Sequence, residues 1–77
     1  MKYLSLDQVP IGISVCVINI NSDDRFSLRL KELGFNKGTQ VTPLFRSAFN
    51  DPSAYMINGA VIALRSEESN KINVRFI

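Results

Sequence analysis

Residues 23–39 constrain the fold more than any other part of the chain. This segment has the composition of an α-helix that Ser22 or Asp23 can cap. Gly34 then stands where a helix end favours a left-handed residue, with Phe35 as the apolar residue that commonly follows. Most of the remaining sequence consists of short β-branched and apolar runs separated by turn residues. The sequence therefore predicts one substantial helix inserted into a small, mainly β protein.

This helix is expected to have an inner and an outer face. Phe26, Leu30 and Leu33 follow the spacing of residues that share one side of a helix, so they are expected to pack against the strands. Leu28 points away from that stripe and is expected to reach solvent. Arg25 and Arg29 lie side by side on the flank. Two interpretations stay open: these residues contact a partner, or they are an ordinary solvated surface with one exposed leucine.

Strand signals occur in five other segments. Pro43 cannot donate to a ladder, so it predicts an edge position or a bulge in a bent strand. Asn58 and Gly59 predict a type I′ hairpin turn. Alternation in the last segment places Phe76 inward, and Glu67 and Glu68 are expected in a solvated turn just before it. In residues 14–20 the alternation is imperfect, which indicates either a bulge or burial on both faces. The five segments are residues 14–20, 41–49, 55–57, 60–65 and 72–76.

These elements predict a single domain over residues 1–77. Five short, bent strands with one hairpin are typical of a small SH3-like barrel. The helix would follow the first strand and occupy the place of a long barrel loop. The N-terminal residues 4–9 are expected to form a folded lead-in that covers one end of the core.

Composition argues against several kinds of function. The chain has no His and one Cys, so it lacks the common nitrogen and sulfur ligands of a metal site and the pairs used in nucleophilic catalysis. Cys16 is expected to be a small buried residue. The net charge of +2 is spread along the sequence, so nucleic acid is not expected as a partner. We expect no catalytic, cofactor or metal residues, and a cytoplasmic protein, since no signal peptide or membrane span is evident.

The chain resembles the FeoA family over nearly its whole length. The most specific match is the segment Arg-Leu-Lys-Glu-Leu-Gly-Phe-Asn-Lys-Gly-Thr at residues 29–39. One departure lies at Asn50, where family members commonly have glycine before Asp51 and Pro52; asparagine tolerates a left-handed backbone, so the turn is expected to survive. The other matching positions are residues 4–6, Gly12, Asp51-Pro52, Gly59, 62–65 and 72–74.

The resemblance implies an SH3-like fold and a cytoplasmic accessory role in bacterial ferrous iron uptake. The implied partner is the membrane transporter FeoB, which carries a cytoplasmic GTP-binding domain, and the implied action is binding without catalysis. The protein would then be peripheral to the membrane only through this partner. The alternative is an SH3-like regulatory module that binds a metal-dependent transcriptional regulator or nucleic acid. An exposed Leu28 would also suit weak self-association.

Two groups of residues are candidates for partner contact. The first is the outer side of the helix, with Leu28 between basic residues, which would suit a groove with acidic rims. The second is the loop after the bent strand. The candidates are Arg25, Leu28, Arg29, Phe49, Asp51 and Tyr55.

Overall fold

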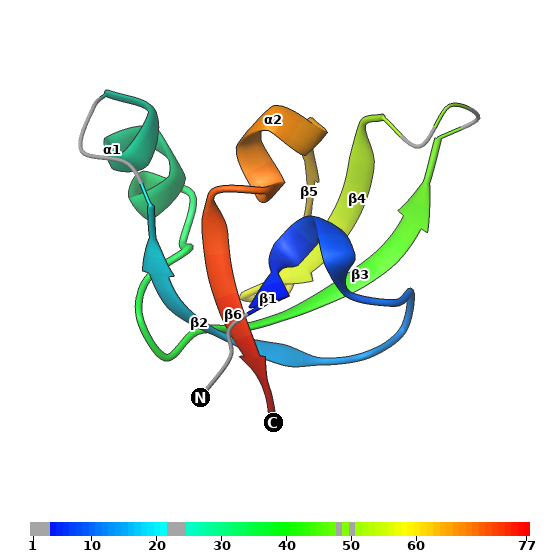
Figure 1. Cartoon of the computed structure of the whole chain (residues 1–77), viewed down its shortest axis with the longest axis horizontal. Coiled ribbons are helices and arrows are strands. Elements are labelled where there is room, and N and C mark those ends of the chain that lie inside the picture. The colour runs from blue at the N-terminus through cyan, green and yellow to red at the C-terminus, as the bar shows by residue number, and fades with distance from the viewer. Residues whose placement is uncertain (1–3, 22–24, 48, 50) are drawn as a thin grey trace.

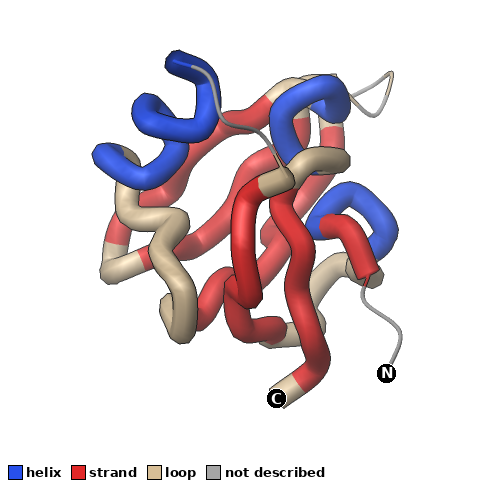
Figure 2. The backbone as a smooth tube through the Cα atoms, turned by 60° about the vertical axis from the view of Figure 1, so that its left-hand side comes forward, coloured by secondary structure: helices blue, strands red, loops and turns tan. Residues whose placement is uncertain are grey.

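The computed structural model describes residues 4–21, 25–47, 49 and 51–77. Within them, six antiparallel strands form one sheet, and three short helices lie around the outside of the strands (Figures 1 and 2). The elements are β1 (Leu4–Ser5), the 3₁₀ helix η1 (Leu6–Gln8), β2 (Val15–Ile20), α1 (Arg25–Glu32), β3 (Gln40–Arg46), β4 (Ser53–Ile57), β5 (Ala60–Leu64), α2 (Ser66–Ser69) and β6 (Ile72–Phe76).

The sheet confirms a mainly β fold with a helix after the first long strand, but the strand count is corrected. The order is β1-β6-β2-β3-β4-β5, so β1 and β5 end the sheet and it does not close. The sixth strand is β1, whose Leu4 and Ser5 pair with Val74 and Asn73 of β6. Two residues carry too little alternation to indicate a strand, so the sequence could only predict a lead-in there. The closed five-stranded barrel is therefore not confirmed.

Two irregularities bend the long strands. The register of β2 against β6 shifts between Val17 and Asn19, which resolves the imperfect alternation of this strand in favour of a bulge. The register of β3 against β4 shifts between Pro43 and Phe45, so Pro43 lies at a bulge inside the sheet. Both bulges curve the sheet around the core. Within the described part of the chain, the buried residues that pack together there are Leu6, Val9, Val15, Val17, Leu30, Phe35, Val41, Tyr55, Ile57, Leu64, Ile72 and Val74.

The hairpin and the helix end confirm the two clearest local predictions. Asn58 and Gly59 have φ of 51° and 78°, the positive pair that a type I′ turn requires. At the end of α1 the Phe35 N–H donates to the Leu30 carbonyl at 3.1 Å, and the Gly34 N–H donates to that of Lys31 at 3.0 Å. These are the two bonds of a Schellman ending. The predicted caps Ser22 and Asp23, and the turn residue Asn50, lie outside the described residues.

Burial follows the predicted pattern on α1 but not at two strand positions. Leu30 is fully buried, and Phe26 and Leu33 pack against the core from its margin, as expected for the inner stripe. Cys16 is only half-buried, because it alternates with the inward residues Val15 and Val17. Phe76 is 52% exposed, although Val15, its partner in register on β2, is buried in the core, because burial along β6 ends at Val74.

Replacing Gly34 with Ala is expected to destabilise the fold by about 1–3 kcal/mol, because φ is +112° and an alanine there is strained. A Cβ at this residue would also lie 2.6 Å from Asn58 Nδ2, so the hairpin side chain would have to move. Urea unfolding measures the loss. Gly38→Ala is the matched control, since φ is +89° but nothing lies within 4 Å of its Cβ. Equal losses would show that the contact with Asn58 contributes nothing.

Candidate functional site

The outer side of α1 is the part of the predicted site that the structure exposes most clearly. Leu28 is 58% exposed, in contrast to the fully buried Leu30 two residues later. Arg25 and Arg29 are exposed on the same helix. Figure 1 shows α1 at one end of the molecule, where this side is not covered by the sheet. We call Arg25, Leu28 and Arg29 the α1 outer face.

Arg29 forms an ion pair with a residue of α2, and the sequence did not indicate this contact. Its Nη1 donates to Oε2 of Glu68 on α2, and Glu68 Oε1 accepts the Arg65 N–H at 3.0 Å. Glu68 is buried, which corrects the prediction of a solvated turn, whereas Glu67 beside it is exposed. The Arg29 side chain is still 55% exposed, so it can also face a partner. The ion pair links α1 to α2.

The carboxylate of Glu68 is held ionised by these contacts. Burial raises its pKa, but the hydrogen bond from the Arg65 backbone and the Arg29 guanidinium together outweigh burial and hold the pKa below its ordinary value. A pKa that is lower in the folded than in the unfolded chain adds stability above the unfolded pKa. That stability is lost as the pH falls through the folded pKa.

Glu68→Gln should therefore lower the free energy of unfolding by about 1–2 kcal/mol near neutral pH, since a charge-assisted hydrogen bond is lost but Arg29 is partly solvated. Urea unfolding at several pH values measures the difference from wild type. We expect a constant difference above about pH 5 that shrinks on acidification, as wild-type Glu68 becomes protonated. A difference that does not change with pH would show that the ionised carboxylate is not its source.

The second predicted group of residues does not form one surface. Phe49 is 90% exposed. Asp51, however, is engaged within the fold: its Oδ1 accepts the Ser66 N–H at the start of α2 at 2.7 Å, and its own N–H donates to Ser47 Oγ at 3.0 Å. In Figure 1 the end of β3 and the start of β4 lie on the opposite side of α2 from α1. Phe49 and the α1 outer face are therefore not brought together.

The prediction that Tyr55 contacts a partner is wrong, because its side chain is buried. It is 1% exposed and belongs to the core cluster, because Ser53, Tyr55 and Ile57 form the inward-facing side of β4. Tyr55 is close to the loop in the sequence, but its burial depends on which side of β4 faces the core. Of the six predicted contact residues, Arg25, Leu28, Arg29 and Phe49 are thus exposed, Asp51 is half-buried and Tyr55 is inaccessible.

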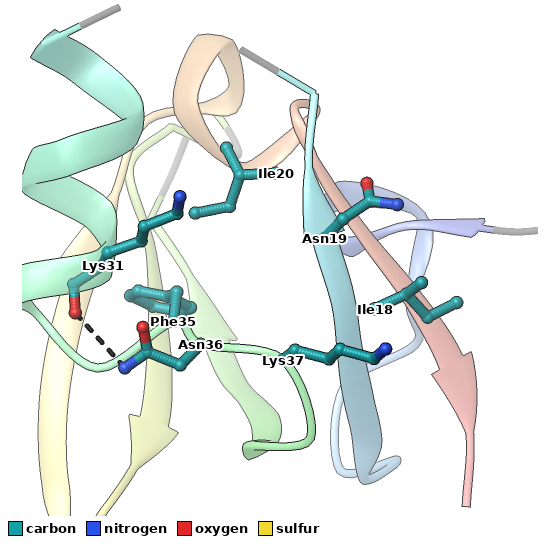
Figure 3. Close-up of a pocket in the computed structure, with 7 residues that line it drawn as sticks. All are labelled: Ile18, Asn19, Ile20, Lys31, Phe35, Asn36 and Lys37. Atoms are coloured by element: carbon teal, nitrogen blue, oxygen red, sulfur yellow. Dashed lines mark hydrogen bonds between the residues drawn. The ribbon is translucent and has the colours of Figure 1, made fainter. Parts of the chain in front are cut away.

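A pocket of about 280 Å³ lies between the C-terminal end of α1 and β2, and sequence reasoning missed it. Figure 3 shows the side chains of Lys31 and Ile20 extending toward each other from the two elements, with the Phe35 ring below them in this view. The Asn36 side-chain amide donates to the Lys31 carbonyl at 3.4 Å, which fixes one wall. The seven lining residues, which we call the α1–β2 groove, are Ile18, Asn19, Ile20, Lys31, Phe35, Asn36 and Lys37.

Two further features bear on the kind of site. Among the described residues, no three His, Cys, Asp or Glu side chains are grouped so that they could hold a metal ion. No helix in the described part is long and apolar enough to cross a bilayer. What the structure offers in this part of the chain is therefore an exposed helix face and an adjoining groove.

Comparison with known proteins gives a consistent family match. The model of the FeoA domain family matches residues 4–76. An FeoA-like protein from Clostridium acetobutylicum is 26% identical, with a TM-score of 0.91, and the match covers 100% of this chain and 90% of that one. FeoA from Stenotrophomonas maltophilia in complex with zinc is described as a prokaryotic SH3 domain protein. It is 26% identical, with a TM-score of 0.84, and the match covers 94% of this chain and 89% of that one.

The same fold also occurs in a different class of protein. A manganese-dependent transcriptional repressor bound to manganese is 20% identical, with a TM-score of 0.89; the match covers 100% of this chain but 38% of the repressor. This likeness shows the fold alone. No curated protein sequence matches the chain.

Proposed function

The chain belongs to the FeoA family, and from this membership we propose that it is a small accessory protein of ferrous iron uptake. It acts by binding the cytoplasmic GTPase region of an FeoB-type membrane transporter, and it regulates or assembles that transporter. The family match over residues 4–76 supports the link to iron transport. So does the likeness to Stenotrophomonas maltophilia FeoA, which is described as a candidate activating factor of bacterial ferrous iron transport.

The observation that carries this proposal is the α1 outer face. The inner stripe of α1 accounts for the packing of the helix, and the Schellman ending accounts for its glycine. Neither explains a leucine that is 58% exposed between two arginines. Interfaces take most of their energy from a few large anchors surrounded by polar residues. Leu28 fits the anchor of a helix that docks in a groove with acidic rims.

We propose further that the protein acts in the cytoplasm and has no catalytic activity of its own. The sequence offers no His, so neither a Ser–His nor a Cys–His catalytic pair can be built from it. The fold shared with a manganese-dependent repressor does not favour a role in transcription, because a likeness at 20% identity concerns architecture only.

Isothermal titration of the chain into the purified cytosolic region of an FeoB-type transporter tests the proposal. We expect saturable binding with a defined stoichiometry, measured with GDP, with a non-hydrolysable GTP analogue and without nucleotide. No binding in any of these states would contradict it. The alternative partner, nucleic acid, would instead show an affinity that falls steeply with salt, because phosphate contacts release counterions.

A further inference from the structure

We propose that the α1–β2 groove receives a short segment of the transporter's cytosolic region in which an apolar residue is flanked by Asp or Glu. This inference rests on the function proposed above and names the chemistry of the docked segment. It involves residues that the prediction of contact sites did not include, with Lys31 and Lys37 as its charged members.

The groove exists because β2 loses one of its two neighbours along its length. At its start β2 pairs with β3, Val15 opposite Val41 and Cys16 opposite Gln40. The last contact with that side is at Val17, whose N–H donates to the Thr39 carbonyl at 2.9 Å. From Ile18 onward β2 pairs only with β6 among the described strands. The side that β3 vacates faces α1 (Figure 3).

The vacated side of β2 presents backbone as well as side chains. Ile20 is paired with Ile72 of β6, and the next residue, Asn21, donates its N–H to the Lys71 carbonyl at 2.7 Å. In an antiparallel pair, residues that exchange hydrogen bonds with the partner alternate with residues that do not. The N–H and C=O of Ile20 therefore point away from β6, toward the groove. An extended segment could bond to them.

The charged side chains that line the groove are both positive. Lys31 and Lys37 line it, and none of its seven residues is acidic. The ion pair that the described residues form is Arg29 with Glu68, so neither lysine has a carboxylate partner there. The apolar lining that an occupant can reach comes from Ile18 and Ile20, which are half-buried, since Phe35 is 1% exposed. A carboxylate next to an apolar side chain complements both features.

The groove adjoins the α1 outer face, so one partner can occupy both. Leu28 and Lys31 are three residues apart on α1, which places them as neighbours along the helix surface. A protein segment fits better than nucleic acid. Two lysines contact few phosphates, and Phe35 is 1% exposed, so it offers no face on which a base could stack.

Fluorescence anisotropy with a labelled synthetic peptide of alternating glutamate and leucine tests the chemistry. Wild-type protein should bind this peptide, and Lys31→Glu and Lys37→Glu should each weaken binding by about tenfold or more, since each replaces an attraction with a repulsion. Arg75→Glu, an exposed charge reversal on β6, is the matched control and should stay within about twofold of wild type. Circular dichroism should show the same fold for all three variants.

Three results would overturn the inference. One is an equal loss of affinity in Arg75→Glu, which would indicate attraction by net charge alone. Another is equal binding of a peptide in which serine replaces leucine, which would show that the apolar lining of the groove does not contribute to binding. The third is equally effective competition by an oligonucleotide, which would point to phosphate as the ligand.

The cytosolic region of the transporter separates this inference from the function on which it rests. If the region binds wild type and both lysine variants equally, the groove is not the docking site but the proposed function stands. If the region does not bind wild type while the acidic peptide does, the proposed function and the source of the segment are wrong. The preference of the groove for acidic, apolar segments would then stand alone.

Discussion

Leu28→Asp is expected to weaken binding to the transporter's cytosolic region by about 30-fold or more, the effect of losing an interface anchor. Leu28 is 58% exposed, so the aspartate is solvated in the free protein. The loss of stability should stay within about 0.5 kcal/mol, as is usual for surface substitutions. Titration calorimetry measures the affinity, and urea unfolding with circular dichroism measures the fold.

Val61→Asp is the matched control for this variant. Val61 is an apolar residue of β5 that is 57% exposed, almost the same as Leu28, but it lies on a different element. It should bind the transporter region like wild type. An unchanged affinity for Leu28→Asp, or the same loss in both variants, would contradict a specific role for the α1 outer face.

Leu30→Ala is expected to have the opposite effect, lowering the free energy of unfolding by about 2–5 kcal/mol. Leu30 is fully buried in the core, and its carbonyl accepts the Phe35 bond that ends α1. Truncation leaves a cavity between α1 and the sheet that close-packed neighbours fill only in part. A domain of 77 residues has a small stability margin, so this variant should be close to unfolding at 37 °C.

Urea unfolding measures this loss, and Leu28→Ala on the same helix is its control. Both replacements remove the same atoms from leucines two residues apart, yet Leu28→Ala should change stability by less than about 0.5 kcal/mol. A loss below about 1 kcal/mol for Leu30→Ala would contradict the assignment of the inner stripe as the anchor of α1.

The features that could be predicted from sequence depend on residues close together in the chain. The ending at Gly34 and the turn at Asn58 and Gly59 are determined by local backbone preference, and the structure has both. The exposure of Leu28 follows from helical spacing relative to the inner stripe. Pro43 identified a bulge because proline cannot donate to the ladder. Each of these signals depends on residues that are near neighbours in the chain.

The features that could not be predicted depend on contacts between distant residues. The sequence around Glu68 predicts a solvated charge, because its partner Arg29 lies 39 residues away in the chain and comes close only in the folded protein. Tyr55 is predicted to be accessible near the loop, but the sheet turns its side of β4 toward the core. The α1–β2 groove depends on where β3 leaves β2, which neither strand indicates alone. The sequence indicates this groove only through Lys31 and Lys37, the two lysines on either side of Gly34.

Mapping the binding site of the transporter's cytosolic region on the chain by NMR tests directly whether the outer side of α1 is the contact surface. Backbone amide shifts are recorded for the ¹⁵N-labelled chain as the unlabelled region is added. We expect the perturbed amides to concentrate in α1 and in residues 18–20 and 35–37, with β5 unaffected. Perturbations centred on β5 and the β3–β4 loop, with α1 unchanged, would contradict the central claim that the outer side of α1 binds the transporter.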